Sequence, residues 1–231
     1  MADIEWLTKE PLVARWVKEA MKRVLIVDDH EVVRNGLKKI LEEQSGEIAF
    51  GEAGAAAEAI TLVREQAWDI VILDISLGGG RNGLETLKEL KQIRPRLQVL
   101  ILTMHSEEQY ARRSFRSGAA GYITKDSPRA ELVRAVNKVM EGGKYVSPAL
   151  AEKLVAYIEK DTDGPPHEIL SDREFQVMRL IASGKTVGEI AELLSLSDKT
   201  ISTYRARVLE KMGMKTNAEL THYAIRNELV N

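Results

Sequence analysis

Five short apolar segments alternate with helix-length segments through the first part of this 231-residue chain. The apolar runs are continuous instead of alternating in and out, which indicates strands covered on both faces. Strand and helix in strict alternation predict an α/β fold with a doubly wound, five-stranded parallel sheet. The predicted strands are RVLIV (23–27), EIAFGEA (47–53), DIVILD (69–74), LQVLILT (97–103) and GYIT (121–124), and the predicted helices are 30–44, 55–66, 83–94, 106–117 and 127–141.

The pattern changes after about residue 145. Segment 148–160 predicts one more amphipathic helix, and DTDGPPHEI (161–169) consists of turn residues typical of a hinge. No strand signal follows Leu170, and helices are predicted over 172–183, 186–194, 198–212 and 217–228. We predict four parts: an N-terminal helical extension (1–22), an α/β domain (23–143), a linker helix and hinge (144–166) and a small all-α domain (167–231).

The N-terminal extension has two interpretations. Its apolar residues predict either a helix that packs on its own domain or one that exposes Trp6 and Trp16 to a partner.

Composition excludes several classes of protein. The chain has no cysteine, which rules out disulfides and thiolate metal sites and fits a reducing compartment. No run approaches 18 apolar residues, and the N-terminus lacks the apolar core of a signal peptide. We therefore expect a cytoplasmic protein without a membrane partner. The formal net charge of −2 gives no sign of nucleic acid, so DNA binding has to be inferred from local charge.

Three aspartates follow strands that a parallel sheet places side by side. Asp28 and Asp29 follow the first strand and Asp74 ends the third. Since sites in such folds lie at the carboxyl ends of the strands, these carboxylates are expected to converge. Their mutual repulsion would raise at least one pKa, and a hard divalent cation such as Mg²⁺ relieves it. The sequence therefore predicts a magnesium site.

Two further residues extend this predicted site. Thr103 ends the fourth strand with a hydroxyl, and Lys125 follows the fifth with an ammonium group. Carboxylate, cation, hydroxyl and ammonium around one point suit phosphoryl transfer with Asp74 as nucleophile. Each residue alone is equally compatible with a solvated strand end; the combination favours a phosphoryl site.

The segments VLIVDDHEVVRNGL, DIVILDISL, VLILTMH and GAAGYITKD resemble the receiver domain of two-component response regulators over residues 23–143. The resemblance implies a flavodoxin-like fold, a sensor histidine kinase as phosphodonor and Mg²⁺ as cofactor. It also implies a role for each matching residue: Asp74 as phospho-acceptor, Asp28, Asp29 and Asp74 as metal ligands with the main-chain carbonyl of Ser76, Thr103 as switch hydroxyl, Lys125 as phosphate-neutralising lysine and Tyr122 as aromatic switch. For Tyr122 the alternative is a half-buried strand tyrosine.

The segment after the acceptor departs from the family pattern. DISLGGGRNGLE lacks the usual proline and has three glycines before Arg81. Because glycine has more backbone freedom to lose, we expect this loop to be more mobile than its counterparts, with phosphoryl chemistry retained.

TVGEIAELLSLSDKTISTYRARVLEKMG predicts a helix, a short turn and a second helix. Segment 198–212 carries four cations against two acids, and small polar residues occupy the outward side of its N-terminal half. Short side chains flanked by cations suit the DNA major groove. An ordinary helical bundle with a solvated basic face is the alternative on composition alone.

Residues 167–228 are similar to the LuxR-type helix-turn-helix domain of NarL/FixJ response regulators. The resemblance implies a recognition helix over 198–211 and a last helix, NAELTHYAIRNEL, through which two copies pair on adjacent half-sites. Because Ala206 has no polar side chain, we expect base recognition at that position to depend on methyl contact and DNA shape. The implied residues nearest the bases are Ser202, Thr203 and Ala206, and the implied phosphate contacts are Lys199, Thr200, Arg205, Arg207 and Lys211.

Together these features predict a phosphorylation-gated transcription regulator and not an enzyme. In the inactive form the receiver is expected to cover the recognition helix, and the hinge is expected to let it swing clear before the protein dimerises. One alternative is an aspartyl-phosphate-forming phosphohydrolase, although such enzymes place a general acid two residues after the nucleophile, where this chain has Ser76. Another is a receiver that acts as a passive dimerisation module.

Overall fold

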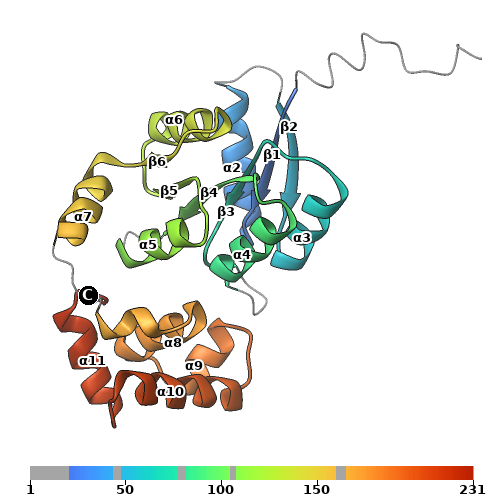
Figure 1. Cartoon of the computed structure of the whole chain (residues 1–231). Helices are drawn as coiled ribbons and strands as arrows, with labels where there is room; N and C mark the ends of the chain where they lie inside the picture. Colours follow the sequence, from blue (N-terminus) through green and yellow to red (C-terminus); the bar gives the residue numbers. More distant parts are fainter. Residues whose placement is uncertain (1–20, 44–47, 78–81, 105–107, 160–164, 231) are drawn as a thin grey trace, which may run out of the picture.

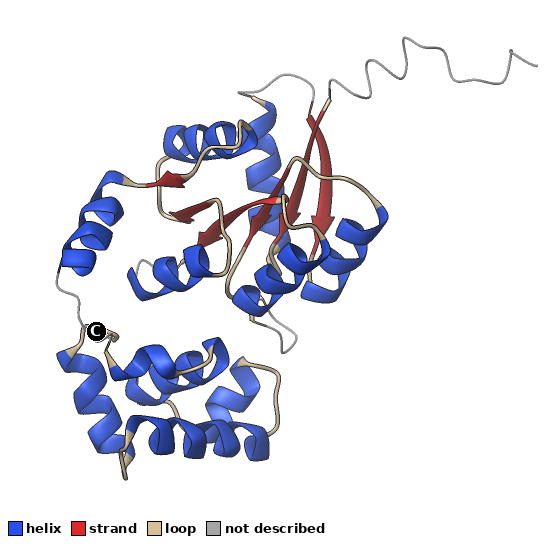
Figure 2. Cartoon of the chain, in the orientation of Figure 1, coloured by secondary structure: helices blue, strands red, loops and turns tan. Residues whose placement is uncertain are grey.

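The structure is a computed structural model that describes residues 21–43, 48–77, 82–104, 108–159 and 165–230. An α/β part lies above a part that is helical over its described residues (Figures 1 and 2). The prediction of an N-terminal helix over 1–22 falls almost entirely outside the described residues.

The α/β part contains a parallel sheet with strand order β2-β1-β3-β4-β5-β6. The doubly wound parallel fold is confirmed, but the predicted count of five strands is wrong by one. The extra edge strand, β6, has two residues, which is too short to produce an apolar run. The strands are β1 (Lys22–Val27), β2 (Ile48–Ala53), β3 (Ile70–Leu73), β4 (Gln98–Thr103), β5 (Gly121–Thr124) and β6 (Tyr145–Val146).

Helices cover both faces of the sheet, as continuous apolar strands require. On one face α2 (Glu31–Glu42) and α6 (Arg129–Met140) bury leucine and valine side chains against alternate strand residues such as Ile26 and Ile72. On the other face α3 (Ala56–Glu65), α4 (Gly83–Ile93) and α5 (Glu108–Arg116) cover Val27, Leu73 and Ile101. Both sides of the sheet are therefore apolar core, and polar side chains gather at the strand ends.

The second part confirms the predicted helix-turn-helix arrangement. The linker helix α7 (Pro148–Glu159) leads to a 3-10 helix, η1 (Pro166–Ile169), and then to α8 (Asp172–Ala182), α9 (Val187–Leu193), α10 (Asp198–Met212) and α11 (Asn217–Arg226). Serine or threonine side chains cap the N-termini of these last four helices, which explains where each begins. None of the helices in the described part of the chain is long and apolar enough to cross a bilayer.

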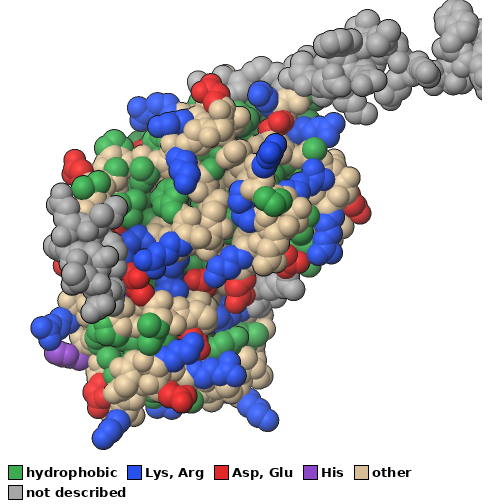
Figure 3. All heavy atoms as spheres, in the orientation of Figure 1, with side chains coloured by type: hydrophobic (Ala, Val, Ile, Leu, Met, Phe, Trp, Pro, Cys, Tyr) green, Lys and Arg blue, Asp and Glu red, His purple; other side chains and the backbone are tan. Residues whose placement is uncertain are grey.

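The two parts contact each other through both apolar and charged side chains. The Tyr110 ring of α5 meets the Phe175 ring of α8 edge-on, with 5.5 Å between centroids. This contact makes the core of the helical part continuous with the core under α3, α4 and α5. Basic and acidic side chains lie side by side where the upper and lower parts meet (Figure 3).

Candidate functional site

Asp28 and Asp74 lie next to each other at the carboxyl edge of the sheet because their strands are paired. Val27 is opposite Leu73 in the register, and the Asp74 N–H donates to the Val27 carbonyl at 2.9 Å. Both side chains are almost completely buried, with residue exposures of 2% each. The predicted convergence of these two carboxylates is present in the structure.

Lys125 is the positive charge between these carboxylates. Its Nζ atom lies 2.6 Å from Asp28 Oδ2 and 2.7 Å from Asp74 Oδ2. Burial lowers the pKa of Lys125, but hydrogen bonds to Asp28 and Asp74 outweigh burial and hold the pKa above its ordinary value. Charge repulsion between the two aspartates is thus relieved within the chain itself, a role that sequence reasoning assigned to a metal ion alone.

Asp29 lies at the mouth of the site beside a residue that sequence reasoning missed. His30 Nδ1 is 2.8 Å from Asp29 Oδ1 and 3.2 Å from Asp28 Oδ1. The His30 backbone N–H also donates to Asp28 Oδ1 at 2.9 Å, so the turn after β1 orients the buried carboxylate. The sequence signal was present, since His30 directly follows the paired acids.

Ser76 and Gly83 fix the path of the chain beyond the acceptor strand. The Ser76 backbone N–H donates to Asp74 Oδ1 at 3.1 Å, and the Gly83 N–H donates to the Ile75 carbonyl at 2.9 Å. A Cβ atom on Gly83 would lie only 2.2 Å from the Asp74 carbonyl oxygen, so this close approach requires glycine. The prediction of a mobile glycine-rich loop concerns residues 78–81, which lie outside the described residues.

Thr103 and Tyr122 are both buried. Thr103 is opposite Thr124 in the register, and its carbonyl accepts a hydrogen bond of 2.8 Å from the Lys125 backbone N–H. Thr103 therefore ends its strand at the same sheet edge as Lys125. Tyr122 is 1% exposed, so it is more deeply buried than the half-buried strand tyrosine given above as the alternative.

The donor atoms at this edge fit a hard divalent cation. Asp28 and Asp74 offer buried carboxylate oxygens, and ligand atoms of Asp28, Asp29 and His30 lie within 4.8 Å of one another. Carboxylate and carbonyl oxygens with room for water are what Mg²⁺ prefers. The Asp29 side chain is 30% exposed, which leaves one side of the cluster accessible from solvent.

The predicted DNA-contacting residues lie on one exposed side of α10, while Ile201, Val208 and Met212 are buried against the helical core. Two of the predicted phosphate contacts already have partners. Arg205 donates to Asn217 Oδ1 at 2.6 Å, and Lys211 Nζ lies 2.7 Å from Glu174. The exposed members are Lys199, Ser202, Thr203, Ala206, Arg207 and Lys211, and the half-exposed members are Thr200 and Arg205.

Comparisons with known proteins agree with both parts of the chain. Residues 24–137 match the response regulator receiver domain, and residues 168–224 match the bacterial regulatory proteins of the luxR family. The chain is 37% identical to the response regulator UvrY of Escherichia coli K12 over 91% of its own length and 97% of UvrY. It belongs to the NarL/FixJ family of response regulators.

Solved structures of response regulators resemble most of the chain. An RcsB response regulator from Salmonella typhimurium, described for its conformational dynamism in DNA interaction, matches with a TM-score of 0.63 and 27% identity, over 88% of this chain and 96% of RcsB. An RcsB–DNA complex matches with a TM-score of 0.56 and 27% identity, over 88% of this chain and 97% of that chain. The chain is therefore a two-component response regulator with a LuxR-type DNA-binding domain. The predicted domain boundaries stay predictions.

The arrangement of this response regulator corrects the expectation that the receiver covers the recognition helix. The receiver contacts η1 and α8, whereas α10 lies on the far side of the DNA-binding domain (Figure 1). The residues predicted to lie nearest the bases, Ser202, Thr203 and Ala206, are exposed.

The end of the predicted hinge is an anchored helical turn. Residues 166–169 form η1, where His167 is 1% exposed and its ring accepts or donates a 2.8 Å hydrogen bond with the Tyr223 hydroxyl. Turn-rich composition did not indicate this anchored segment, because its partners come from α5 and α11.

Proposed function

We propose that this response regulator accepts one phosphoryl group on Asp74 from a sensor histidine kinase and, once phosphorylated, binds DNA as a homodimer. The observation that carries the proposal is the contact of Lys125 with both buried aspartates, at 2.6 and 2.7 Å. A buried acceptor with a fixed ammonium group beside it is arranged to receive a transferring phosphoryl group.

The residues of the chain account for the transfer step. An Asp74 carboxylate oxygen attacks phosphorus, the new P–O bond forms, and the P–N bond of the donor breaks with its electron pair left on the imidazole nitrogen. Lys125 then balances the added negative charge, and the hydroxyl of Thr103 is the hydrogen-bond donor assigned to one phosphoryl oxygen. Asp28, Asp29 and the Ser76 carbonyl would hold Mg²⁺, which supplies charge neutralisation when bound.

Phosphorylation alters the charge that Lys125 has to balance. Before transfer, one ammonium group is shared by Asp28 and Asp74. After transfer the phosphoryl oxygens compete for the same ammonium group. Thr103 ends β4 and Lys125 follows β5, so these two residues transmit the change in charge to the two strands. Tyr122, in the middle of β5, is the aromatic residue assigned to follow this change. A modification acts only by favouring one of two conformations, typically by a few kcal/mol.

DNA binding is assigned to the exposed side of α10, with Ser202, Thr203 and Ala206 nearest the bases. Around them lie the predicted phosphate contacts Lys199, Thr200, Arg205, Arg207 and Lys211. One helix therefore both positions the domain on the DNA backbone and reads the bases. The RcsB–DNA complex supports this assignment by likeness. Pairing of two copies is assigned to α11, where Ile225 is 58% exposed.

The test is DNA selection followed by a binding comparison. Genomic fragments from the source organism would be enriched on protein treated with phosphoramidate and Mg²⁺, and affinities would then be measured for wild type and Asp74→Asn after the same treatment. We expect the wild type to bind the selected fragments at least about tenfold more tightly. Equal, specific binding by both proteins would contradict the gating.

A further inference from the structure

The DNA-binding domain lies directly over the mouth of the phospho-acceptor site. The carboxyl ends of the central strands face the helical domain in the cartoons (Figures 1 and 2). A cavity of about 490 Å³ separates the two domains at this point. From the receiver it is lined by Asp29, His30, Ser76, Leu77 and Tyr110, and from α8, α9 and the residues next to them by Gln176, Arg179, Leu180, Ser183, Leu193 and Leu194.

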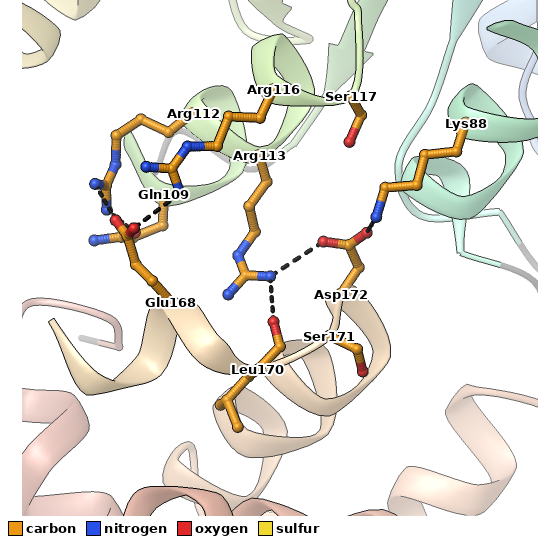
Figure 4. Close-up of a pocket in the computed structure, with 10 residues that line it drawn as sticks. All are labelled: Lys88, Gln109, Arg112, Arg113, Arg116, Ser117, Glu168, Leu170, Ser171 and Asp172. Atoms are coloured by element: carbon orange, nitrogen blue, oxygen red, sulfur yellow. Dashed lines mark hydrogen bonds and ion pairs between the residues drawn. The ribbon is translucent and has the colours of Figure 1, made fainter. Parts of the chain in front are cut away.

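Charged contacts beside this cavity hold the two domains together (Figure 4). Arg113 of α5 donates to the carbonyls of His167 and Leu170 at 2.9 and 2.8 Å and pairs with Asp172 at 3.1 Å. The guanidinium group of Arg113 also stacks over the Phe175 ring, 4.4 Å from its centroid. One receiver side chain therefore binds both η1 and the start of α8.

Two acidic residues of the DNA-binding domain form ion pairs with other basic side chains of the receiver. Asp172 accepts a 2.6 Å hydrogen bond from Lys88 of α4, and Glu168 pairs with Arg112 and Arg116 of α5. The carboxylates of Asp172 and Glu168 are 6% and 15% exposed, so both depend on these partners. These charged groups regain water when the domains separate, so their part of the contact is reversible.

The helices across the cavity limit what can reach the acceptor while the domains are docked. Side chains of α8 and α9 form the wall of the cavity that faces Asp29 and Ser76, and a protein helix with its side chains is about 10–12 Å across. A phosphohistidine carried on a protein helix has to come within about 3–3.5 Å of the Asp74 carboxylate to react. Such a helix therefore has to displace α8 and α9 to come that close, whereas a cavity of about 490 Å³ has room for a small phosphodonor.

We propose that the docked DNA-binding domain makes the acceptor site selective for the size of its phosphodonor. Small phosphoramidates or acyl phosphates react in the docked form, and a kinase reacts only after the contacts of Arg113, Lys88, Glu168 and Asp172 have opened. In either reaction a P–O bond to Asp74 forms, and the donor leaves with the electrons of its bond to phosphorus. The inference rests on the proposed function of Asp74 and adds that the docked DNA-binding domain controls access to Asp74.

The test uses the absence of cysteine from the chain. Ser76→Cys places a single thiol in the wall of the cavity, and its alkylation is timed with iodoacetamide and with a maleimide carried on a polyethylene glycol chain wider than the cavity. Asp172→Lys and Lys88→Glu, each combined with Ser76→Cys, open the contact from opposite sides. Glu210→Lys, on the exposed surface of α10, is the matched control for charge and for mutation of the DNA-binding domain.

We expect the rate of bulky labelling relative to small labelling to rise about tenfold in both opening variants and to stay unchanged in Glu210→Lys. Two opening variants guard against a folding defect in one of them. Equal ratios in the parent and in folded opening variants would overturn the inference.

A second measurement follows phosphorylation by phosphoramidate with Mg²⁺ in the cysteine-free proteins. Its rate should differ by less than about twofold between wild type, Asp172→Lys and Lys88→Glu. A rate that rises in parallel with bulky labelling would overturn the size selectivity, since small donors would then be excluded as well. If no protein is phosphorylated, the proposed function and the selectivity that depends on it both fail, while the labelling ratio still decides whether the domain shields the site.

Discussion

Lys125 and Asp74 form a 2.7 Å hydrogen bond at the buried edge of the sheet, between groups that are 11% and 2% exposed. Asp28 receives the same ammonium group at 2.6 Å. This contact connects the ends of β3 and β5 and offsets part of the negative charge of the site.

Loss of this ammonium group should destabilise the receiver. Lys125→Met leaves two buried carboxylates without their cation, and we expect the free energy of unfolding to fall by about 3 kcal/mol in metal-free buffer. Mg²⁺ should restore part of the loss, because it supplies another positive charge. Urea denaturation with and without Mg²⁺ measures both effects. Lys38→Met, which removes a more exposed pair with Glu52, is the control and should cost less than about 1 kcal/mol. Equal losses in the two variants would contradict the role of Lys125.

His167 should make the stability of the DNA-binding domain sensitive to acid. Burial, with the nearby charges of Arg112 and Arg113, lowers the pKa of His167 to about 4 from an ordinary 6.5. Between these values the unfolded chain binds more protons than the folded chain, so stability falls as the pH drops from 6.5 toward 4, by at most about 3 kcal/mol.

The variant His167→Gln removes the titrating ring and should give a shallower pH slope in that window. Thermal denaturation at several pH values provides the comparison. Parallel slopes for wild type and variant would show that the His167 ring does not contribute.

Two glycines should respond to alanine in opposite directions. In Gly83→Ala the new Cβ atom would lie 2.2 Å from the Asp74 carbonyl oxygen and 2.6 Å from the Ile75 Cα atom. These are backbone atoms of the acceptor strand, so we expect a loss of more than about 2 kcal/mol together with slower phosphorylation. Gly36 lies inside α2, and apart from its chain neighbours and the nearby backbone of its own helix no atom lies within 4 Å of the same position, so Gly36→Ala should stabilise by about 0.5–1 kcal/mol. Denaturant titration of both variants tests the pair, and a neutral Gly83→Ala would contradict the predicted clash.

Alanine substitutions should divide the cations of α10 into two groups according to their effect on domain stability. Lys199 and Arg207 are exposed, so replacing either with alanine should weaken binding to every DNA sequence and lower the salt slope by about 0.9. Lys211 pairs with Glu174, which is 4% exposed and caps α8, so Lys211→Ala should in addition lower domain stability by about 1–3 kcal/mol. Binding isotherms at several salt concentrations, with melting curves of each variant, make the distinction. A Lys211→Ala variant that loses only DNA affinity would contradict it.

Local patterns in the sequence were sufficient for most of the fold. Continuous apolar strands indicated a sheet covered on both faces, and the acids after β1 and β3 could be placed together because neighbouring parallel strands end at one edge. β6 was missed because Tyr145 and Val146 form no pattern of their own.

Contacts between residues distant in the chain could not be predicted in the same way. Lys125 and Asp74 are 51 residues apart, and Arg113 and Asp172 are 59 apart. The predicted cover over the recognition helix was wrong because the position of α8 against α5 depends on such contacts, including the one between Tyr110 and Phe175.

The central claim is that Asp74 accepts and keeps a single phosphoryl group, and intact-protein mass measured together with released phosphate tests it most directly. Wild type and Asp74→Asn would be incubated with phosphoramidate and Mg²⁺. We predict that the wild type gains the mass of one phosphoryl group per chain and then releases phosphate slowly, while Asp74→Asn gains none. Equal modification of Asp74→Asn would contradict the claim, and so would continuous release of many phosphates per chain, which is the behaviour of a phosphohydrolase.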